Sequence, residues 1–184
     1  EEVPTPEDYP CYPMSPYGIA KLSVEHYLRF YKEFHGLNYG VTRYANVYGP
    51  RQNTKGEAGV IAIFAEKMLE KIHPIIHGDG HQTRDFVFVG DVVSANMAVF
   101  KSDGSDTYNV GTGRQTTINE VYRCISENLG GGFKEKHSDD FSGQKVSCLS
   151  TEKINKHLGW SSSVNVSEGI KQTIEWFENK EDSK

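Results

Sequence analysis

The spacing of apolar residues along the chain predicts helices that alternate with short strands. Apolar side chains recur at helical spacing in six segments, which are 17–35, 59–72, 91–100, 117–129, 151–158 and 167–179. Short apolar or alternating runs predict strands at 39–46, 74–77, 84–89 and 108–110. This alternation is typical of the α/β class, although the strong strands are too few for a complete doubly wound sheet.

Local signals predict where two of these helices begin or end. Ser15 is a suitable N-cap, and Pro16 stands at the first helical position, where its missing N–H costs nothing. Gly36 follows as a C-terminal stop. Farther along the chain, Thr117 and Glu120 have the spacing of a capping box, which predicts the start of another helix.

Composition and charge narrow the class of protein. Hydrophobic residues make up 36% of the 184 positions and aromatic residues 11%, which is a globular composition. No apolar run approaches the roughly 20 residues that a membrane span needs, so we expect no membrane segment. The net charge is -5, and Lys and Arg form no stripe. We therefore expect no nucleic-acid partner.

The first residues and the cysteines favour a cytoplasmic protein. Residues 1–10 are acidic and proline-rich, unlike a signal peptide. The sequence does not start with Met, and we expect it to belong to a longer chain. Cys11, Cys124 and Cys148 are odd in number and follow no motif spacing, which favours reduced thiols.

Tyr17 and Lys21 are the strongest candidates for chemistry. Their spacing of four residues places both side chains on one face of the predicted helix. A tyrosine hydroxyl normally has a pKa of about 10, and a cation within about 4–6 Å favours the phenolate and lowers that pKa. The pair can therefore form a phenolic acid–base group. The alternative is an ordinary aromatic and lysine on an amphipathic helix.

Four segments in a fixed order resemble one family. They are SPYGIAK at 15–21, RYANVYGPR at 43–51, GDGHQTRDFVFVGDVV at 78–93, and INKHLGW at 154–160 followed by SEGIKQTIEWF. Together they are similar to the extended short-chain dehydrogenase/reductases, and within them to the NAD-dependent epimerases and dehydratases of nucleotide sugars. The greatest likeness is to the 4-epimerases of UDP-sugars, and it covers nearly the whole chain.

The resemblance implies an incomplete Rossmann-like parallel sheet with a small α/β substrate-binding domain. Residues 1–50 would be the C-terminal part of the NAD-binding domain, and residues 51–184 mainly the substrate domain. The segment at about 80–110 would return to the Rossmann sheet. No glycine-rich phosphate loop follows any predicted strand, and GTGR at 111–114 is only a weak look-alike. We therefore expect this chain alone not to bind NAD tightly.

The family's roles transfer to three residues near the cofactor. By resemblance, Tyr17 is the general base, and Lys21 is its partner and holds the nicotinamide ribose. Tyr44 falls where the family lines the nicotinamide pocket, and a packed strand aromatic is the other interpretation of it. The implied cofactor is NAD.

Three further residues match positions that approach the substrate. By resemblance, Asn46 corresponds to an asparagine that contacts the sugar nucleotide. An amide suits this role because it can both donate and accept hydrogen bonds. A turn-forming Asn before Gly49 and Pro50 is the alternative. Gly59 and Val60 align with the start of a helix whose free N–H groups would face an anion.

The predicted diphosphate and base contacts lie farther along the chain. Arg84 is the candidate for the diphosphate, because a guanidinium binds phosphate in bidentate fashion. A surface ion pair with Asp85 or Asp79 is the alternative for Arg84. Ile75 and His77 fall where similar enzymes sandwich the uracil.

One loop departs from the family pattern. An Arg and an Asp are usual before the last helices, whereas residues 139–147 read DDFSGQKVS, with Lys145 as a possible substitute cation. Histidines at 73, 77 and 81 do not share a helical face, so we expect no metal site.

The implied reaction is epimerisation of a nucleotide sugar at C4 through a 4-keto intermediate, with UDP-glucose and UDP-galactose as the favoured pair. A nucleotide-sugar 4,6-dehydratase and a non-catalytic sensor of NAD or a sugar nucleotide remain alternatives, as does an assembly piece completed by another chain. The resemblance also implies a homodimer through the helix that carries Tyr17. Its surplus apolar residues are Tyr27, Leu28, Phe30, Tyr31 and Phe34.

Overall fold

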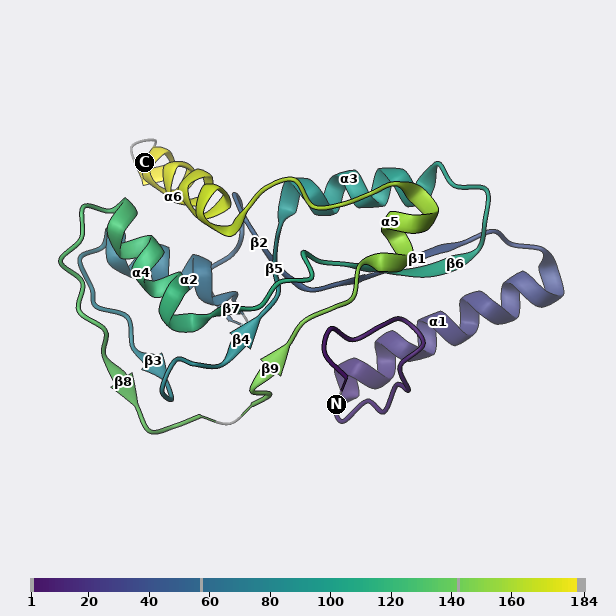
Figure 1. The fold of residues 1–184 in the computed structure, drawn as a ribbon, viewed down its shortest axis with the longest axis horizontal. Helices are drawn as coiled ribbons and strands as arrows, with labels where there is room; N and C mark the ends of the chain where they lie inside the picture. Colours follow the sequence, from purple (N-terminus) through teal and green to yellow (C-terminus); the bar gives the residue numbers. More distant parts are fainter. Residues whose placement is uncertain (1, 57, 142, 182–184) are drawn as a thin grey trace.

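The computed structural model describes residues 2–56, 58–141 and 143–181, and the α/β class is confirmed (Figure 1). The helices are α1 (Pro16–His35), α2 (Val60–Leu69), α3 (Val89–Phe100), α4 (Ile118–Asn128), α5 (Glu152–Leu158) and α6 (Val166–Glu181). The strands are β1 (Gly40–Tyr44), β2 (Asn46–Tyr48), β3 (Ile76–His77), β4 (Thr83–Arg84), β5 (Phe86–Phe88), β6 (Asp106–Val110), β7 (Thr116–Thr117), β8 (His137–Ser138) and β9 (Val146–Ser147). Each predicted helix corresponds to one of the six.

The local signals at the helix ends are confirmed. The Ser15 hydroxyl accepts a hydrogen bond of 3.1 Å from the Gly18 N–H, and α1 ends at Gly36 in a left-handed conformation with φ 69°. At α4 the Thr117 hydroxyl accepts from the Glu120 N–H, while the Glu120 carboxylate accepts from the Thr117 N–H. These hydrogen bonds from Thr117 lower the pKa of Glu120.

The predicted strand 39–46 is wrong in its boundaries, because the chain changes pairing partner at Ala45. The β1 strand pairs in parallel with β6, and the Ala45 N–H still donates to the Val110 carbonyl at 2.9 Å. One residue later, the Asn46 N–H donates to the Asp85 carbonyl at 2.8 Å, and β2 pairs in parallel with β5. The segment therefore joins two sheets.

The remaining pairings are short. The β3 strand pairs in parallel with β8, and β4 lies between β7, which is antiparallel to it, and β9, which is parallel. The strands β7, β8 and β9 each span two residues and were not predicted, because two residues give no detectable apolar alternation.

Two apolar cores underlie this arrangement. In the first core, α2, α4 and α6 pack together over β2 and β5 through Ile61, Met68, Tyr122, Ile125 and Ile170. In the second core, α3 and α5 pack against β5 and β6 through Val87, Ala95, Val110, Ile154 and Trp160. The division of the chain near residue 50 stays a prediction.

Helix α1 is attached differently from the other helices. It lies along one side of the β1–β6 pair, opposite α3 (Figure 1), yet none of its residues is buried. The Arg43 guanidinium on β1 makes a bidentate contact with the Glu25 carboxylate on α1, with N–O distances of 2.8 and 2.6 Å. Its third nitrogen donates to the Glu7 carbonyl at 3.0 Å. The hydrogen bond to Glu25 raises the pKa of Arg43, which keeps the guanidinium charged.

Because Arg43 and Glu25 are only 27% and 21% exposed, we predict that their contact governs the stability of α1. In Arg43→Met, the loss of charge-assisted hydrogen bonds worth roughly 1.5–3 kcal/mol should speed amide exchange throughout α1 by about tenfold or more. Hydrogen exchange followed by mass spectrometry measures this rate.

The matched control is Arg123→Met, which removes an ion pair with Glu135 in which Arg123 is 59% exposed. That change should cost less than about 1 kcal/mol and leave α1 unaffected. Equal exchange of α1 in the wild type and in Arg43→Met would show that another contact holds the helix.

Candidate active site

A cavity of about 800 Å³ lies where the start of α1, strands β2 to β4 and helix α2 converge. Its wall is formed by Tyr17, Ala45, Asn46, Val47, Tyr48, Gln52, Ala58, Gly59, Val60, Ile61, Ile63, Phe64, Lys67, Ile75, His77, Gln82, Arg84, Phe86, Ile118 and Phe141. The partner change at Ala45 creates this space, because β2 diverges from β1 there and passes beside β5.

Seven of the nine residues predicted for a site line this cavity. They are Tyr17, Asn46, Gly59, Val60, Ile75, His77 and Arg84. Lys21 and Tyr44 do not line it. The roles of all nine residues stay predictions. The seven side chains that line the cavity nevertheless come from elements as distant as α1 and β4.

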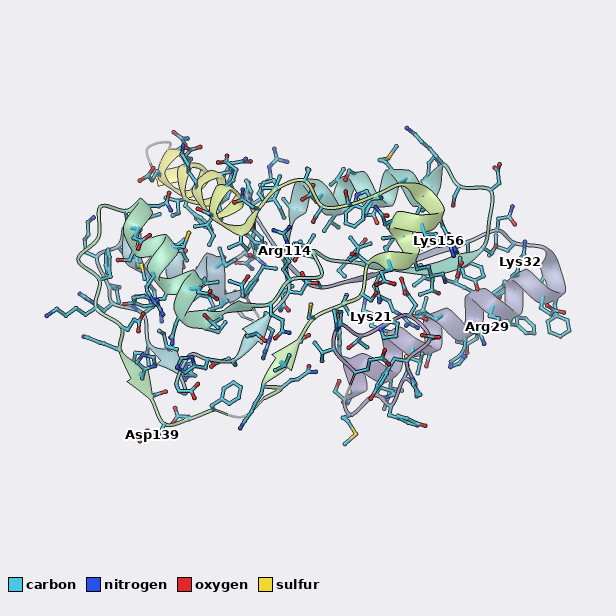
Figure 2. The ribbon with its side chains drawn as sticks, in the orientation of Figure 1. Lys21, Arg29, Lys32, Arg114, Asp139 and Lys156 are labelled. Atoms are coloured by element: carbon cyan, nitrogen blue, oxygen red, sulfur yellow. The ribbon has the colours of Figure 1, made fainter. Side chains whose placement is uncertain are left out.

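Tyr17 and Lys21 lie together on the first turns of α1. The Lys21 ammonium is 5.4 Å from the centre of the Tyr17 ring, and the Tyr17 side chain is 72% exposed. Figure 2 shows Lys21 rising from the first part of α1 toward the middle of the molecule, whereas Arg29 and Lys32 lie toward its outer end. The pair therefore presents a phenol on the cavity wall with a cation one helical turn away.

Tyr44 lies on the opposite side of β1 from Arg43. Its hydroxyl donates to the Asn96 side-chain carbonyl on α3 at 3.0 Å, and its ring is half exposed. The Tyr44 ring neither packs in a core nor lines the cavity, and its role beside the nicotinamide stays a prediction.

Arg84 faces the cavity without a carboxylate partner. One of its nitrogens donates to the Thr83 carbonyl at 2.7 Å, and partial burial lowers its pKa. No ion pair reaches it from any of the described residues. Asp79 instead accepts from the His81 N–H at 2.9 Å. The guanidinium therefore has donors left for an anion.

The Asp85 side chain points away from Arg84 and is buried. Its carboxylate accepts from the Thr112 N–H at 2.8 Å, the Thr112 hydroxyl at 2.6 Å, the Gly113 N–H at 3.2 Å and the Leu149 N–H at 3.3 Å. The N–H groups of the GTGR loop are thus occupied by a carboxylate. This loop is not a phosphate cradle.

The amino end of α2 opens onto the cavity. Gly59 is the N-cap and supplies no side-chain hydrogen bond, so the N–H groups of the first turn are free of a side-chain cap. Gln52 lies directly against Gly59 and donates to the Val47 carbonyl at 3.1 Å. Sequence reasoning missed Gln52 and Lys67, which lie outside the quoted motif segments, and Gln82, which lies inside one of them but was given no role.

The histidines are held apart. The His77 Nδ1 is 3.1 Å from the Ser138 hydroxyl, while His73 packs on Phe133 with ring centres 5.2 Å apart. Within the described ranges, no three His, Cys, Asp or Glu side chains group as metal ligands. Lys145 lies in an adjacent hollow of about 560 Å³ with Gly78 and His137, and not on the wall of the cavity.

The chain is similar to known proteins over nearly its whole length. The family profile described as GDP-mannose 4,6 dehydratase matches residues 1–173. A putative UDP-glucose 4-epimerase of Methanocaldococcus jannaschii is 41% identical over 177 residues, which are 96% of this chain and 58% of that protein. A dTDP-D-glucose 4,6-dehydratase of Mus musculus is 32% identical over 180 residues.

Solved structures show the same likeness. The UDP-glucose 4-epimerase of Thermotoga maritima with UDP-glucose matches with a TM-score of 0.94 and 44% identity, over 98% of this chain and 59% of that one. The UDP-glucose 4-epimerase of Thermus thermophilus in complex with NAD matches with a TM-score of 0.83 and 39% identity, over 94% and 57%.

The fold thus belongs to the Rossmann-fold class that these epimerase structures share. The chain belongs to the GDP-mannose 4,6-dehydratase family of NAD-dependent epimerases and dehydratases. It spans 58% of the Methanocaldococcus jannaschii protein, 57% of a UDP-glucose 4-epimerase of Mycolicibacterium smegmatis and 50% of the mouse dehydratase. No helix in the described part of the chain is long and apolar enough to cross a bilayer.

Proposed function

We propose that this chain supplies the substrate site and the proton-transfer residue of an NAD-dependent nucleotide-sugar 4-epimerase, with UDP-glucose and UDP-galactose as its substrates. One observation carries the proposal: Tyr17, with Lys21 one turn away, stands on the wall of a cavity that also contains Asn46 and Arg84. A phenolic base, an amide and an unpaired guanidinium are the groups that an oxidisable sugar linked to a diphosphate requires.

The cavity gives each part of such a substrate a place. The diphosphate would meet Arg84 and the free amino end of α2, which together offer donors and positive charge. The sugar would lie toward Tyr17 and Asn46. The base would lie toward Ile75 and His77. The volume of about 800 Å³ is within the range of ligand pockets for molecules of this size.

The residues present fit one end of NAD. The Tyr17 hydroxyl and the Lys21 ammonium are exposed polar groups that would hold the nicotinamide ribose. The GTGR loop after β6 binds the Asp85 carboxylate, and no GxGxxG pattern follows a strand in the described part of the chain. The pyrophosphate of NAD would therefore be held by residues outside this chain. When bound, NAD supplies reversible hydride transfer at carbon.

Tyr17 would move the proton of the reaction. As the base, Tyr17 would take the proton from the sugar C4 hydroxyl as that carbon is oxidised, with Lys21 one helical turn away. The Tyr17 phenol returns the proton when the 4-keto sugar is reduced. Epimerisation requires the keto sugar to present its other face in between, and Asn46 would release and recapture it at the strand end.

Two alternative functions would differ from an epimerase in what they produce. A 4,6-dehydratase would convert the 4-keto sugar to a 4-keto-6-deoxy sugar and would need an additional acid–base pair. A non-catalytic sensor would bind the same ligands without turnover. The presence of Tyr17 beside Lys21 favours an enzyme, since a sensor has no use for a phenolic base.

The first test replaces Tyr17 in the full-length enzyme. Tyr17→Phe should lower kcat with UDP-glucose by about 100-fold or more, because the proton loses its acceptor, while UDP-glucose affinity changes less than twofold. Turnover assays and calorimetry measure the two quantities.

Tyr27→Phe is the control for this test, because Tyr27 is an exposed tyrosine on the same helix, and it should retain full activity. An unchanged kcat in Tyr17→Phe would end the assignment of the base. Accumulation of a 4-keto-6-deoxy sugar in the wild type would identify a dehydratase instead.

The second test concerns the cofactor. We predict that the 184-residue chain binds NAD at least about 100-fold more weakly than the full-length enzyme does, because the chain offers only the ribose contacts. A fluorescence titration with NADH measures both dissociation constants. Similar affinities in the two proteins would refute the prediction.

We further propose that α1 pairs with its counterpart in a second copy of the chain. Tyr27, Phe30, Tyr31 and Phe34 are exposed on it, with Phe34 69% exposed and the rings of Phe30 and Phe34 4.8 Å apart. Leu28, between them in sequence, is half-buried. Apolar area of this kind on a helix without buried residues favours a twofold contact.

The third test measures this association. Phe34→Asp should raise the dimer dissociation constant by about tenfold or more in sedimentation analysis, because the contact would bury an unpaired charge. Phe100→Asp is the control, since Phe100 is 82% exposed and ends α3, which lies on the other side of the β1–β6 pair (Figure 1). A monomeric wild-type protein, or equal effects of the two changes, would contradict the pairing.

A further inference from the structure

One end of the cavity carries apolar surface that belongs to neither core. Ile75 is 50% exposed, His77 is exposed, and Phe141 is half-buried, and all three line the cavity. None of them packs into the two apolar cores. Side chains that gather on a cavity wall without joining a core are available to a ligand, and here they are a ring, an imidazole and a branched alkyl group.

Phe141 stands out within its own loop. The residues before it are Asp139 and Asp140, and Figure 2 shows Asp139 at the outer tip of the loop between β8 and β9. The Phe141 ring instead turns inward and lines both the cavity and the adjacent hollow. It therefore forms the partition between the two spaces.

Gly78 is what lets the Phe141 ring reach this place. A β-carbon at Gly78 would lie 2.9 Å from the Phe141 β-carbon, and Gly78 has φ 78°, which favours glycine. The turn after β3 and the loop after β8 are thus fitted to each other. The parallel pairing of His77 with Ser138 in β3 and β8 fixes the same two segments.

The His77 ring is also held in orientation. Its Nδ1 is 3.1 Å from the Ser138 hydroxyl and 3.8 Å from the Asp140 carboxylate. These contacts engage one edge of the imidazole and leave the rest of the ring on the cavity wall. Two flat side chains from neighbouring loops therefore border the same end of the cavity.

We propose that Phe141 stacks on the pyrimidine base of the nucleotide sugar and is a determinant of its binding. This rests on the proposed function, in which the base lies toward Ile75 and His77. An aromatic ring offers a base dispersion and π-stacking contact without charge. In the family that this chain resembles, this loop carries a cation. Here the loop contributes a stacking surface, and its Lys145 lines the neighbouring hollow.

The proposal separates two kinds of contact within one cavity. The phosphates are met by the positive groups Arg84 and Lys67 and by the amino end of α2, whereas the base is met by Phe141. A change at Phe141 should therefore affect only ligands that carry a base. A change at Arg84 should affect every ligand that carries a phosphate.

The experiment uses calorimetric titration of the 184-residue chain with UDP and with inorganic pyrophosphate. In Phe141→Leu, UDP should bind about tenfold more weakly or worse, while pyrophosphate binding should be unchanged. Phe141→Trp keeps a flat ring and should bind UDP within about threefold of wild type. Arg84→Met should weaken both ligands.

Leucine keeps an apolar contact on Gly78, and an unchanged urea midpoint for Phe141→Leu would show that the loop still folds. UDP affinity equal to wild type in that variant, or equal losses of UDP and pyrophosphate, would overturn the stacking role alone. Absence of UDP binding by the wild-type chain would overturn the proposed function and the stacking role with it.

Discussion

A single guanidinium, that of Arg43, joins segments that share little buried surface. It reaches the Glu25 carboxylate on α1 with two nitrogens and the Glu7 carbonyl of the N-terminal loop with the third. The Glu7 carboxylate in turn accepts from the Asn109 N–H on β6 at 2.8 Å. The position of Tyr17 relative to the cavity therefore depends on a directional ionic contact, because α1 has no buried side chain to hold it.

The second constraint is the change of strand partner at Ala45. Parallel pairing with β6 ends there and pairing with β5 begins, so that the exit of β2 and the end of β4 face the same space. Asp85 completes this junction from both its backbone and its side chain, since its carbonyl accepts from Asn46 and its carboxylate from the loop after β6. The two residues on either side of this junction, Asn46 and Arg84, are thereby presented to one ligand.

Sequence reasoning succeeded where the signal is local. Ser15, Pro16 and Gly36 define α1 through contacts within a few residues, and the capping box at Thr117 does the same for α4. The motif segments also led to Tyr17, Asn46 and Arg84 on the cavity wall. They did so because a resemblance already contains the three-dimensional relation among distant segments, which spacing and periodicity do not contain.

Sequence reasoning failed where a structural feature depends on a contact with residues distant in sequence. The break of strand 39–46 at Ala45 depends on Asp85, some 40 positions later, and the strands β7 to β9 exist only because β3 and β4 lie beside them. Asp85 was considered as a partner of Arg84, but its true partners are Thr112, Gly113 and Leu149. Phe141 carried no signal, because a lone aromatic in a polar loop does not reveal which turn it will meet.

The buried Asp85 carboxylate also constrains the order in which parts of the chain fold. Its hydrogen-bond donors are 27, 28 and 64 residues away in sequence, so the last of them can form only after β5, β6 and the segment following β9 have come together. Contacts of such separation close late, since the loops between them must first be ordered. The hydrogen bonds of the Asp85 carboxylate are therefore complete only after Leu149 has reached it. During synthesis the ribosome must therefore release Leu149 before this part of the molecule can become rigid.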